Sequence, residues 1–485
     1  MAKSKTISMR VLFTTIFMLL VCATLSAQQD MSFDEALGAM LAQNHALKSQ
    51  RHMADAAYDD MRAARGLRWP QVNMIGSYTL LQRSIDIDLG GPKGVVTNSI
   101  ESLIKEGVAN GILSSGAASL IAQGLAPIVG SDWRYTLQKR SVGAVGVTFA
   151  MPIYAGGRIN IANRVARLQL EAAELNFDAT KSHLLTELVE RYYGVIVAHE
   201  VVNVRREVVA ATHRHLADAE AMEAEGIVAH SVVLYLSYRL SEAKSELSDA
   251  ESRALIAERA LDALVGHNGV NPSDRIFLCS DIQAIDYYKD IAIKLNPLLQ
   301  EADIARNLAN EGEKLSRAAL LPEVAAMGGA ALYSYQLSDM VPRWMVGIGI
   351  NFKLFDGLAS IRRMQAAKSR AEGVDEAVES ARNDILLLID KEYYTLVNSL
   401  LSVDSSRQAI AFAESYYNSA KEGFVEGITS SSDLMDACAE LAASRVEYLN
   451  AAYESCKALA RLLEAAGLSD TFWEYRDRGE VIYIE

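Results

Sequence analysis

The sequence contains little cysteine, little proline and, after its first 27 residues, no long apolar run. Its 485 residues include only 4 Cys and 8 Pro. So few cysteines, without metal-ligand spacing, exclude a disulfide scaffold and a zinc ribbon, and the low proline content excludes a collagen-like or disordered chain. Because a membrane-spanning helix needs ~18 or more consecutive apolar residues, no such helix is expected in the mature chain.

Positive charge is also scarce. The chain has 47 Lys and Arg against 61 Asp and Glu, which gives a formal net charge of −14 at pH 7. Three of the positive charges lie in the first ten residues, so removal of a leader takes the charge from −14 to −17. Such an acidic chain is a poor candidate for binding nucleic acid.

Residue groupings typical of catalysis or metal binding are absent from the sequence. His213 and His215 are two residues apart, which places them ~200° apart around a helix, where they cannot share a metal. Gly347 and Gly349 lie within a predicted strand that no phosphate-binding loop follows. The sequence therefore predicts no enzyme activity, no metal and no cofactor.

Residues 1–27 have the three parts of a secretory signal peptide. A basic start precedes an apolar stretch from residue 11 to residue 21, and Leu25-Ser26-Ala27 ends in a small residue before Gln28. The alternative is an N-terminal membrane anchor, but the apolar stretch is shorter than the ~20 residues of a span. Val21 is too large to precede an acylated Cys22, so no lipid anchor is expected. The protein is predicted to be exported.

Two copies of one unit follow this leader. Residues of the first copy recur 201 positions later, and upstream of the strands they recur 252 positions later. Matching pairs are Tyr192 and Tyr393, Gly226 and Gly427, Gly266 and Gly467, Asn44 and Asn296, and Pro70 and Pro322. The difference of 51 residues indicates an insertion near residues 85–135 of the first copy. Its Gly- and Ser-rich composition predicts a long exposed loop with one short helix around residues 100–123.

Each copy is predicted to contain a helix, a strand pair and a long helical hairpin. The first helices are expected at residues 34–68 and 296–320, each ending before a proline. The signal peptide is predicted at residues 1–27, and the first repeat at 28–267, with strand pair 70–152 and hairpin 157–267. A linker at 268–295 leads to the second repeat at 296–467, with strand pair 322–355 and hairpin 358–467. Residues 468–485 form a C-terminal tail.

The strand pairs have the pattern of transmembrane β-strands. From residue 344 to 355, bulky apolar residues alternate with small or polar ones, and residues 142–151 repeat the pattern. Strands of ~10 residues with one apolar face suit a membrane barrel, whereas the alternative is a soluble hairpin packed on helices. Aromatic residues near the strand ends are expected to form a membrane-interface belt: Trp69, Trp133, Tyr135 and Trp344.

Four strands per chain are too few to close a barrel. An open sheet edge cannot face lipid, because its unpaired backbone groups would each cost several kcal/mol. The chain must therefore oligomerise: two copies would supply eight strands and three copies twelve.

These features together resemble the TolC family of outer-membrane efflux proteins. The resemblance rests on the leader, the two repeats, the segments Asn44–Leu47 and Asn296–Leu299, the strand starts at Pro70 and Pro322, the strand-to-helix joints Tyr154–Gly157 and Phe355–Gly357, and the hairpin turns at Gly226 and Gly427.

The resemblance implies a mainly α fold with a small β-barrel part. It implies a homotrimer with a twelve-stranded barrel in the lipid of the outer membrane, continued in the periplasm by an α-helical barrel. Residues 268–295 and the C-terminal tail would form an equatorial band around the helices. The expected function is the exit duct of a tripartite efflux system, which carries small molecules from an inner-membrane pump and a periplasmic adaptor protein to the exterior.

The resemblance also implies a periplasmic gate and an adaptor contact at the hairpin turns. Asp433 and Asp436 stand six and nine residues after Gly427, where the family places constricting carboxylates, and their i, i+3 spacing places both on one helix face. The alternative is that Asp433 is a solvated first-turn residue favoured by the helix dipole. Two turn positions, Glu225-Gly226 and Glu426-Gly427, are expected to contact the adaptor, unless these acidic helix ends are merely solvated.

The sequence does not identify the cargo, the pump or the trigger for opening. One alternative function is the exit duct of a type I-like peptide or protein secretion system, which would share the same duct. A remote alternative is a structural surface coiled coil, which would not need alternating strands or aromatic strand ends.

Overall fold

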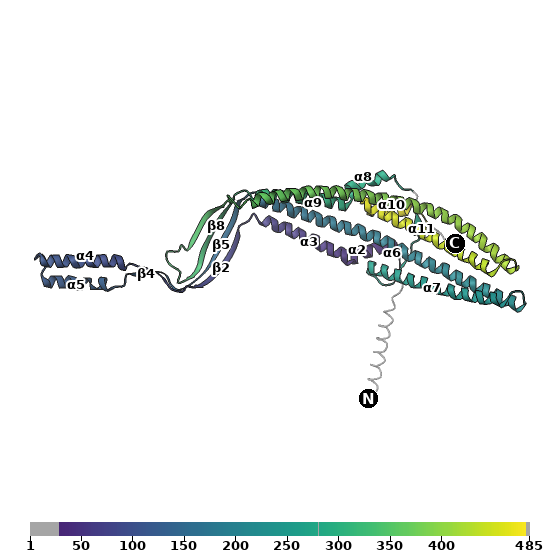
Figure 1. The fold of residues 1–485 in the computed structure, drawn as a ribbon, viewed down its shortest axis with the longest axis horizontal. Helices are drawn as coiled ribbons and strands as arrows, with labels where there is room; N and C mark the ends of the chain where they lie inside the picture. The colour runs from purple at the N-terminus through teal and green to yellow at the C-terminus, as the bar shows by residue number, and fades with distance from the viewer. Residues whose placement is uncertain (1–28, 280, 482–485) are drawn as a thin grey trace, which may run out of the picture. The chain divides into compact units, whose positions relative to one another are not determined.

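The computed structural model describes residues 29–279 and 281–481, so the predicted signal peptide lies outside the described part. The chain divides into two compact units. The first contains residues 29–61, 164–312 and 366–481, and the second contains residues 62–163 and 313–365. Two helices of 67 residues each, α6 (Arg158–Ala224) and α10 (Ala359–Val425), belong partly to each unit (Figure 1).

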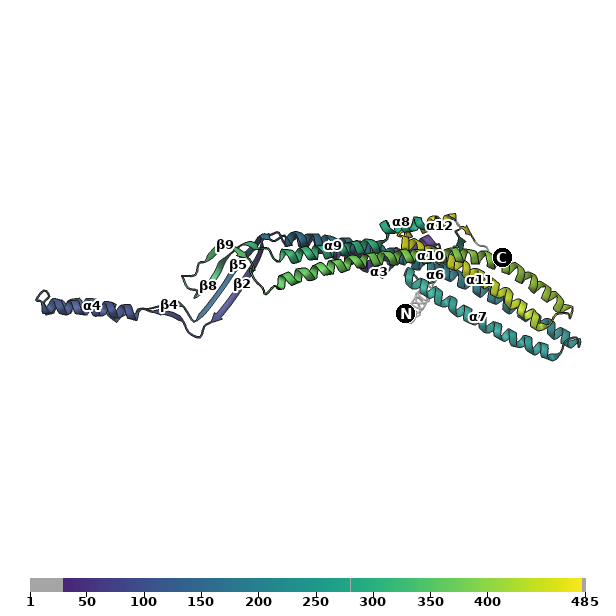
Figure 2. The same ribbon diagram turned by 45° about the horizontal axis from the view of Figure 1, so that its top comes forward.

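A four-stranded antiparallel sheet forms the centre of the second unit. Its strands are β2 (Gln71–Leu80), β5 (Ser141–Ala155), β8 (Glu323–Tyr335) and β9 (Trp344–Asn351), in the order β2-β5-β8-β9 (Figure 2). Alternating residues predicted β5 and β9, and β2 and β8 lie within the predicted strand pairs. Within the described chain, β2 and β9 each pair on one side only, so the sheet has two open edges.

The strand register separates the two faces of the sheet. Directly paired residues lie on the same face of an antiparallel sheet, and one row across all four strands is Val72, Phe149, Gly328 and Val346. The adjacent row on the opposite face is Asn73, Thr148, Gly329 and Met345. One face is therefore bulky and apolar, and the other is small or polar. We call them the apolar face and the polar face.

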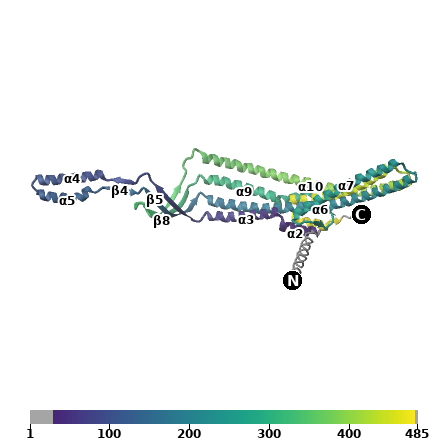
Figure 3. The ribbon, with the colours of Figure 1, turned by 90° about the horizontal axis from the view of Figure 1, so that it is seen from below.

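The insertion between β2 and β5 is helical, so the prediction of a long loop with one short helix was wrong. A ribbon of β3 (Ile85–Asp88) and β4 (Arg134–Gln138) carries two antiparallel helices, α4 (Gly90–Ala109) and α5 (Ser115–Gly130), which lie side by side in Figures 1 and 3. The residues interpreted as loop signals are helix ends. Pro92 lies in the first turn of α4, where proline is tolerated, and the Ser114 hydroxyl caps α5 by accepting from the Ala117 N–H at 3.2 Å.

The first unit is built from helices. They are α2 (Phe33–Gln43), the start of α3 (His45–Gly66), α7 (His230–Val265), α8 (Ile285–Leu295), most of α9 (Pro297–Ala318), α11 (Ser431–Ala466) and α12 (Phe472–Arg478), together with parts of α6 and α10. In the described residues, no helix has both the length and the apolar character needed to cross a membrane.

The predicted single helix over residues 34–68 is two helices, because Asn44 interrupts it. Its backbone is extended (φ −60°, ψ 125°), and its side-chain oxygen accepts from the N–H groups of Ala46 and Leu47 at 2.9 and 3.3 Å. Its side-chain N–H₂ donates to the Leu264 carbonyl at 3.4 Å. The asparagine thus ends α2, caps α3 and ties both to the end of α7.

Asn296 performs the same task in the second repeat. It is buried, accepts from the Leu299 N–H at 3.1 Å and donates to the Ala465 carbonyl at 2.8 Å. Leu264 and Ala465 are themselves 201 positions apart. The repeat seen in the sequence is therefore also a repeat of hydrogen bonds.

The core of the first unit gathers aromatic rings from segments far apart in the sequence. Neighbouring rings in this cluster have their centroids at most 6.0 Å apart. The rings belong to Phe33, Tyr192, Tyr193, Phe277 and Phe472. Short strands bring these segments together: β1 (Gln29–Met31) pairs with β6 (Val270–Pro272), and β7 (Phe277–Leu278) pairs with β10 (Glu480–Val481). The linker before the second repeat and the C-terminal tail thus meet on the helices.

Candidate functional site

Two helical hairpins of the first unit end in turns of the same geometry. The turns between α6 and α7 and between α10 and α11 place Gly226 and Gly427 at φ +74° and +73°. In the second turn, the Ile428 N–H donates to the Gly423 carbonyl at 2.8 Å, and the first turn has the equivalent bond from Ile227 to Met222 at 2.9 Å. These bonds satisfy carbonyl groups that a helix end otherwise leaves free.

Exposed side chains surround both turns. Glu225 and Glu426, which the sequence assigned to an adaptor contact, are exposed. So are Ile227 and Ile428, which leave 64% and 78% of their surface uncovered. Neither isoleucine was predicted from the sequence, although their position directly after each turn glycine was a usable signal.

The two predicted gate carboxylates lie at the start of α11. Asp433 and Asp436 are both exposed, on the same side of the helix. The Ser430 hydroxyl donates to the Asp433 carboxylate at 2.7 Å and accepts from the Asp433 N–H at 3.1 Å, which caps the helix. Asp433 therefore has a structural partner, whereas Asp436 has no hydrogen bond or ion pair to any described residue.

The equivalent positions of the first hairpin are different in character. Val232 and Tyr235 are partly buried and pack against the apolar cluster behind the turns. That cluster includes Leu236, Phe424 and Leu434, which expose at most 4% of their surface. At these two positions, carboxylates are thus presented by the second hairpin only.

A buried histidine links the two hairpins near their turns. His215 of α6 is 3% exposed, and its Nε2 lies 3.0 Å from the hydroxyl of Tyr417 on α10. Burial lowers the pKa of His215 below its usual value; nearby Lys421 and Arg214 act in the same direction, and Asp218 acts against them. The imidazole is therefore neutral at neutral pH.

Acidification is expected to weaken this link. The unfolded chain binds a proton at His215 near pH 6.5, where the folded chain does not, so stability falls as the pH drops below about 6.5 and levels off below the folded pKa. Between about pH 7.5 and about pH 5.5, the melting temperature of the His215→Gln variant should decrease less than that of the parent protein. The glutamine amide keeps a hydrogen-bond partner for Tyr417. The exposed His213→Gln is the matched control, and an equal effect of both variants would contradict the assignment.

The predicted interface aromatics fall into two groups. Trp69 precedes β2 and Trp344 begins β9, with 73% and 70% of their surface exposed. Because β2 and β9 are antiparallel, they start from opposite directions, but the register aligns Trp344 with Val147 of β5 and Met74 of β2, part-way along these longer strands. Trp133 and Tyr135 lie instead at the inserted ribbon, where the Trp133 indole N–H donates to the Ile128 carbonyl at 3.2 Å. Trp133 thus holds the end of α5 rather than the end of a sheet strand.

A basic cavity in the second unit was not predicted from the sequence. About 550 Å³ in volume, it lies where the strands meet the long helices and is lined by Arg158, Glu323, Lys353 and Arg363, among others. Arg158 forms an ion pair with Glu323, and Glu323 and Asn351 are paired residues on the polar face of the sheet. Three segments distant in the sequence contribute the charges, so no local motif indicates the cavity.

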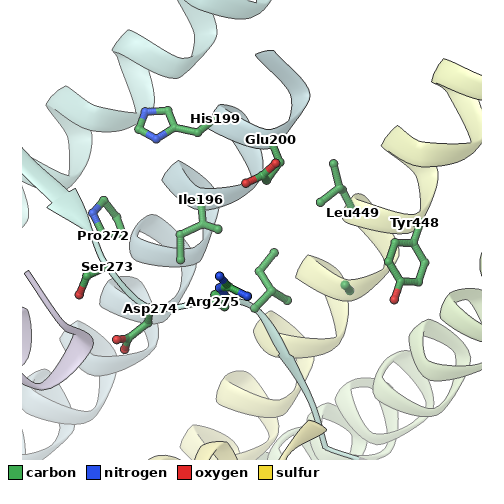
Figure 4. Close-up of a pocket in the computed structure, with 11 residues that line it drawn as sticks. Ile196, His199, Glu200, Pro272, Ser273, Asp274, Arg275, Tyr448 and Leu449 are labelled. Atoms are coloured by element: carbon green, nitrogen blue, oxygen red, sulfur yellow. The ribbon is translucent and has the colours of Figure 1, made fainter. Parts of the chain in front are cut away.

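A second cavity lies in the first unit, with a volume of about 340 Å³. Figure 4 shows its lining: His199 and Glu200 come from α6, residues 272–275 from the end of β6 and the segment after it, and Tyr448 and Leu449 from α11. His199 is held by Glu258 at 2.7 Å. Among the described residues, no group of His, Cys, Asp or Glu has the arrangement of a metal site.

The chain is similar to known outer-membrane proteins over most of its length. The family model described as outer membrane efflux protein matches residues 36–267 and 290–468. The chain is 24% identical to protein CyaE of Bordetella pertussis over 68% of this chain and 73% of CyaE. It is 20% identical to outer membrane protein TolC of Escherichia coli over 84% of this chain and 77% of TolC.

Solved structures support the same fold. The CmeC outer membrane channel of Campylobacter jejuni superimposes with a TM-score of 0.71 at 14% identity, over 91% of this chain and 86% of CmeC. The family model covers both repeats, including the hairpin turns and the four strands. The chain therefore belongs to the outer membrane efflux protein family.

Proposed function

We propose that three copies of this chain form an outer-membrane exit duct, through which an inner-membrane pump and a periplasmic adaptor deliver small molecules to the exterior. The observation that carries the proposal is the four-stranded sheet with two open edges and one apolar face. Pairing of β2 of one copy with β9 of the next would remove every edge, as a membrane requires. Three copies would supply twelve strands, an even number within the range of such barrels.

The residues of the two faces support this arrangement. On the apolar face, Val346, Ile348 and Ile350 leave 65–71% of their surface uncovered, as side chains directed at lipid would. The polar face, with Gln71, Asn73 and Thr148, would line the duct. Trp69, just before β2, and Trp344, at the start of the antiparallel β9, would lie toward opposite membrane interfaces.

The hairpin turns would form the periplasmic end of the duct. Under threefold symmetry, Asp433 and Asp436 would each become a ring of three carboxylates, which favours cations and excludes anions. We assign the adaptor contact to Glu225, Gly226, Glu426 and Gly427 together with Ile227 and Ile428, since this apolar and acidic surface has no cover within the described chain.

Conductance across planar bilayers tests the proposal. The purified protein should form trimeric, cation-preferring pores of low conductance. Replacement of both gate residues, Asp433→Ala with Asp436→Ala, should raise the conductance several-fold and weaken the cation preference, because the rings lose both charge and bulk. The paired Asn variant keeps the size and the capping oxygen, so it should lose the preference with a smaller rise in conductance.

Glu440→Ala is the matched control, since Glu440 is exposed one turn farther along the same side of α11. It should leave both properties unchanged. Pores that ignore the Asp substitutions would remove the gate assignment but not the duct, whereas a protein that forms no pores and no trimer would overturn the proposed function. Deletion of this protein from its host separates efflux from polypeptide export. In the deletion strain, the uptake of small fluorescent substrates and the secretion of polypeptides are both measured.

A further inference from the structure

The inserted α4–α5 hairpin is an apolar surface without a cover in the chain. Neither helix, both of them fully described, contains a buried residue. The hairpin nevertheless exposes eight large apolar side chains, among them Ile112 and Leu120 at 79% and 70%. The complete set is Val95, Val96, Leu103, Val108, Ile112, Leu120, Ile121 and Ile128. Contiguous apolar surfaces of this kind mark interaction sites on exported and soluble proteins alike.

The charge of the hairpin narrows the choice of partner. Helix α5 has no charged residue among its 16 positions, and α4 has two lysines and two glutamates. A helix that binds an anionic lipid surface carries an excess of Lys or Arg on its polar side, whereas the two lysines of α4 are balanced by its two glutamates. A neutral surface can, however, meet identical copies of itself without repulsion.

The chain path supplies the second argument. The β3–β4 ribbon leaves the sheet at the end of β2 and returns at the start of β5, and the Leu81 N–H still donates to the Arg140 carbonyl at 2.7 Å between sheet and ribbon. Strand β2 is one of the open edges that a neighbouring copy must cover. Every copy therefore carries one hairpin next to the edge at which the copies join.

We propose that the α4–α5 hairpins of the three copies pack against one another through their uncharged α5 faces and form a helical bundle at the mouth of the duct. This inference rests on the proposed trimer. The contact surface is the side of α5 formed by Gly116, Leu120, Gln123 and Pro127, which lies opposite Ala118, Leu125 and Val129, the half-buried residues of the helix. The occupant of the apolar surface is thus the same surface of a second copy.

Cross-linking of the full chain in detergent tests the bundle. Gln123→Cys places a thiol beside Leu120 and leaves every apolar side chain intact, while Lys105→Cys places one on the charged side of α4 as the matched control. The described native cysteines, Cys279, Cys438 and Cys456, are buried, and the parent chain measures their background. A short bifunctional maleimide should couple Gln123→Cys between chains, to an extent independent of protein concentration, and should couple Lys105→Cys far less.

A disruption variant completes the test. Adding Leu120→Glu and Ile128→Glu to Gln123→Cys should abolish the coupling, while light scattering still finds a trimer held by the strands. A trimer in which Gln123→Cys couples no better than Lys105→Cys would overturn the bundle and leave the duct standing. Coupling that rises in proportion to concentration, or protection of the thiol by lipid vesicles instead of by a second copy, would also overturn it. Absence of a trimer would refute both proposals.

Discussion

Gly467→Ala is expected to destabilise the protein far more than the same change at Gly427, although both glycines have the same backbone conformation. Their φ angles are +74° and +73°, a region in which an L-residue costs about 1–2 kcal/mol. The difference lies in the space around each Cα. An added Cβ at Gly427 meets nothing within 4 Å, whereas at Gly467 it lies 2.6 Å from the Leu295 carbonyl oxygen and 2.9 Å from the Asn296 nitrogen.

The backbone at Leu295 cannot give way without loss. Asn296 caps α9 and holds the Ala465 carbonyl at 2.8 Å, so its displacement breaks the link between α9 and α11. We expect Gly467→Ala to cost at least about 3 kcal/mol, in the range of buried backbone disruptions, against about 1–2 kcal/mol for Gly427→Ala.

Apparent melting temperatures of the protein in detergent, compared at one scan rate, measure this difference. Gly266, the repeat equivalent of Gly467, supplies an intermediate case because the atoms nearest to its added Cβ belong to the Gln43 side chain, at 3.1 Å and beyond, rather than to backbone. The expected order of loss is Gly467, then Gly266, then Gly427. Equal losses at all three positions would mean that the left-handed backbone alone sets the cost.

The sequence was sufficient to predict the elements whose pattern is repeated and local. Alternation of side chains located β5 and β9, because successive side chains of a strand point to opposite faces of the sheet. The turn glycines and the absence of helix breakers located the two long hairpins. Duplication strengthened each of these predictions, since every signal occurs twice.

The sequence did not reveal features that depend on one side chain or on distant segments. Asn44 interrupts a helix through hydrogen bonds to Leu264, 220 residues away, so the local pattern looked continuous. The inserted helices were missed because the Gly, Ser and Pro residues interpreted as loop signals, at residues 90–92 and 114–116, are caps and first-turn residues rather than loop residues. The basic cavity draws Arg158, Glu323 and Arg363 from three separate parts of the chain.

The two faces of β9 give the second large expected effect, because adjacent residues should respond in opposite ways to the same substitution. Ile348 lies on the apolar face, 69% exposed, and is paired with Ala326. Gly347 lies on the polar face, paired with Met327, and an added Cβ there meets nothing within 4 Å. Both are near the middle of the strand, so they lie at similar depths.

Arginine at residue 348 should prevent normal assembly. A lipid-facing Arg costs up to about 2–4 kcal/mol per chain, depending on its depth, or up to about 6–12 kcal/mol in a trimer by threefold addition. We expect Ile348→Arg to reduce strongly the amount of folded, heat-modifiable trimer in the outer-membrane fraction. Gly347→Arg should assemble normally, because its side chain extends into the water-filled duct.

The assembled Gly347→Arg variant should still differ from the parent in conduction. Three added positive charges in the duct lower cation permeability, so planar-bilayer recordings should find a reduced cation preference in pores of normal abundance. If Gly347→Arg instead blocks assembly and Ile348→Arg does not, the apolar face points inward and the barrel is assigned inside out. If both variants assemble equally, neither face of the sheet meets lipid. The strand pairs would then be soluble β-hairpins packed on helices, which is the alternative given in the sequence analysis.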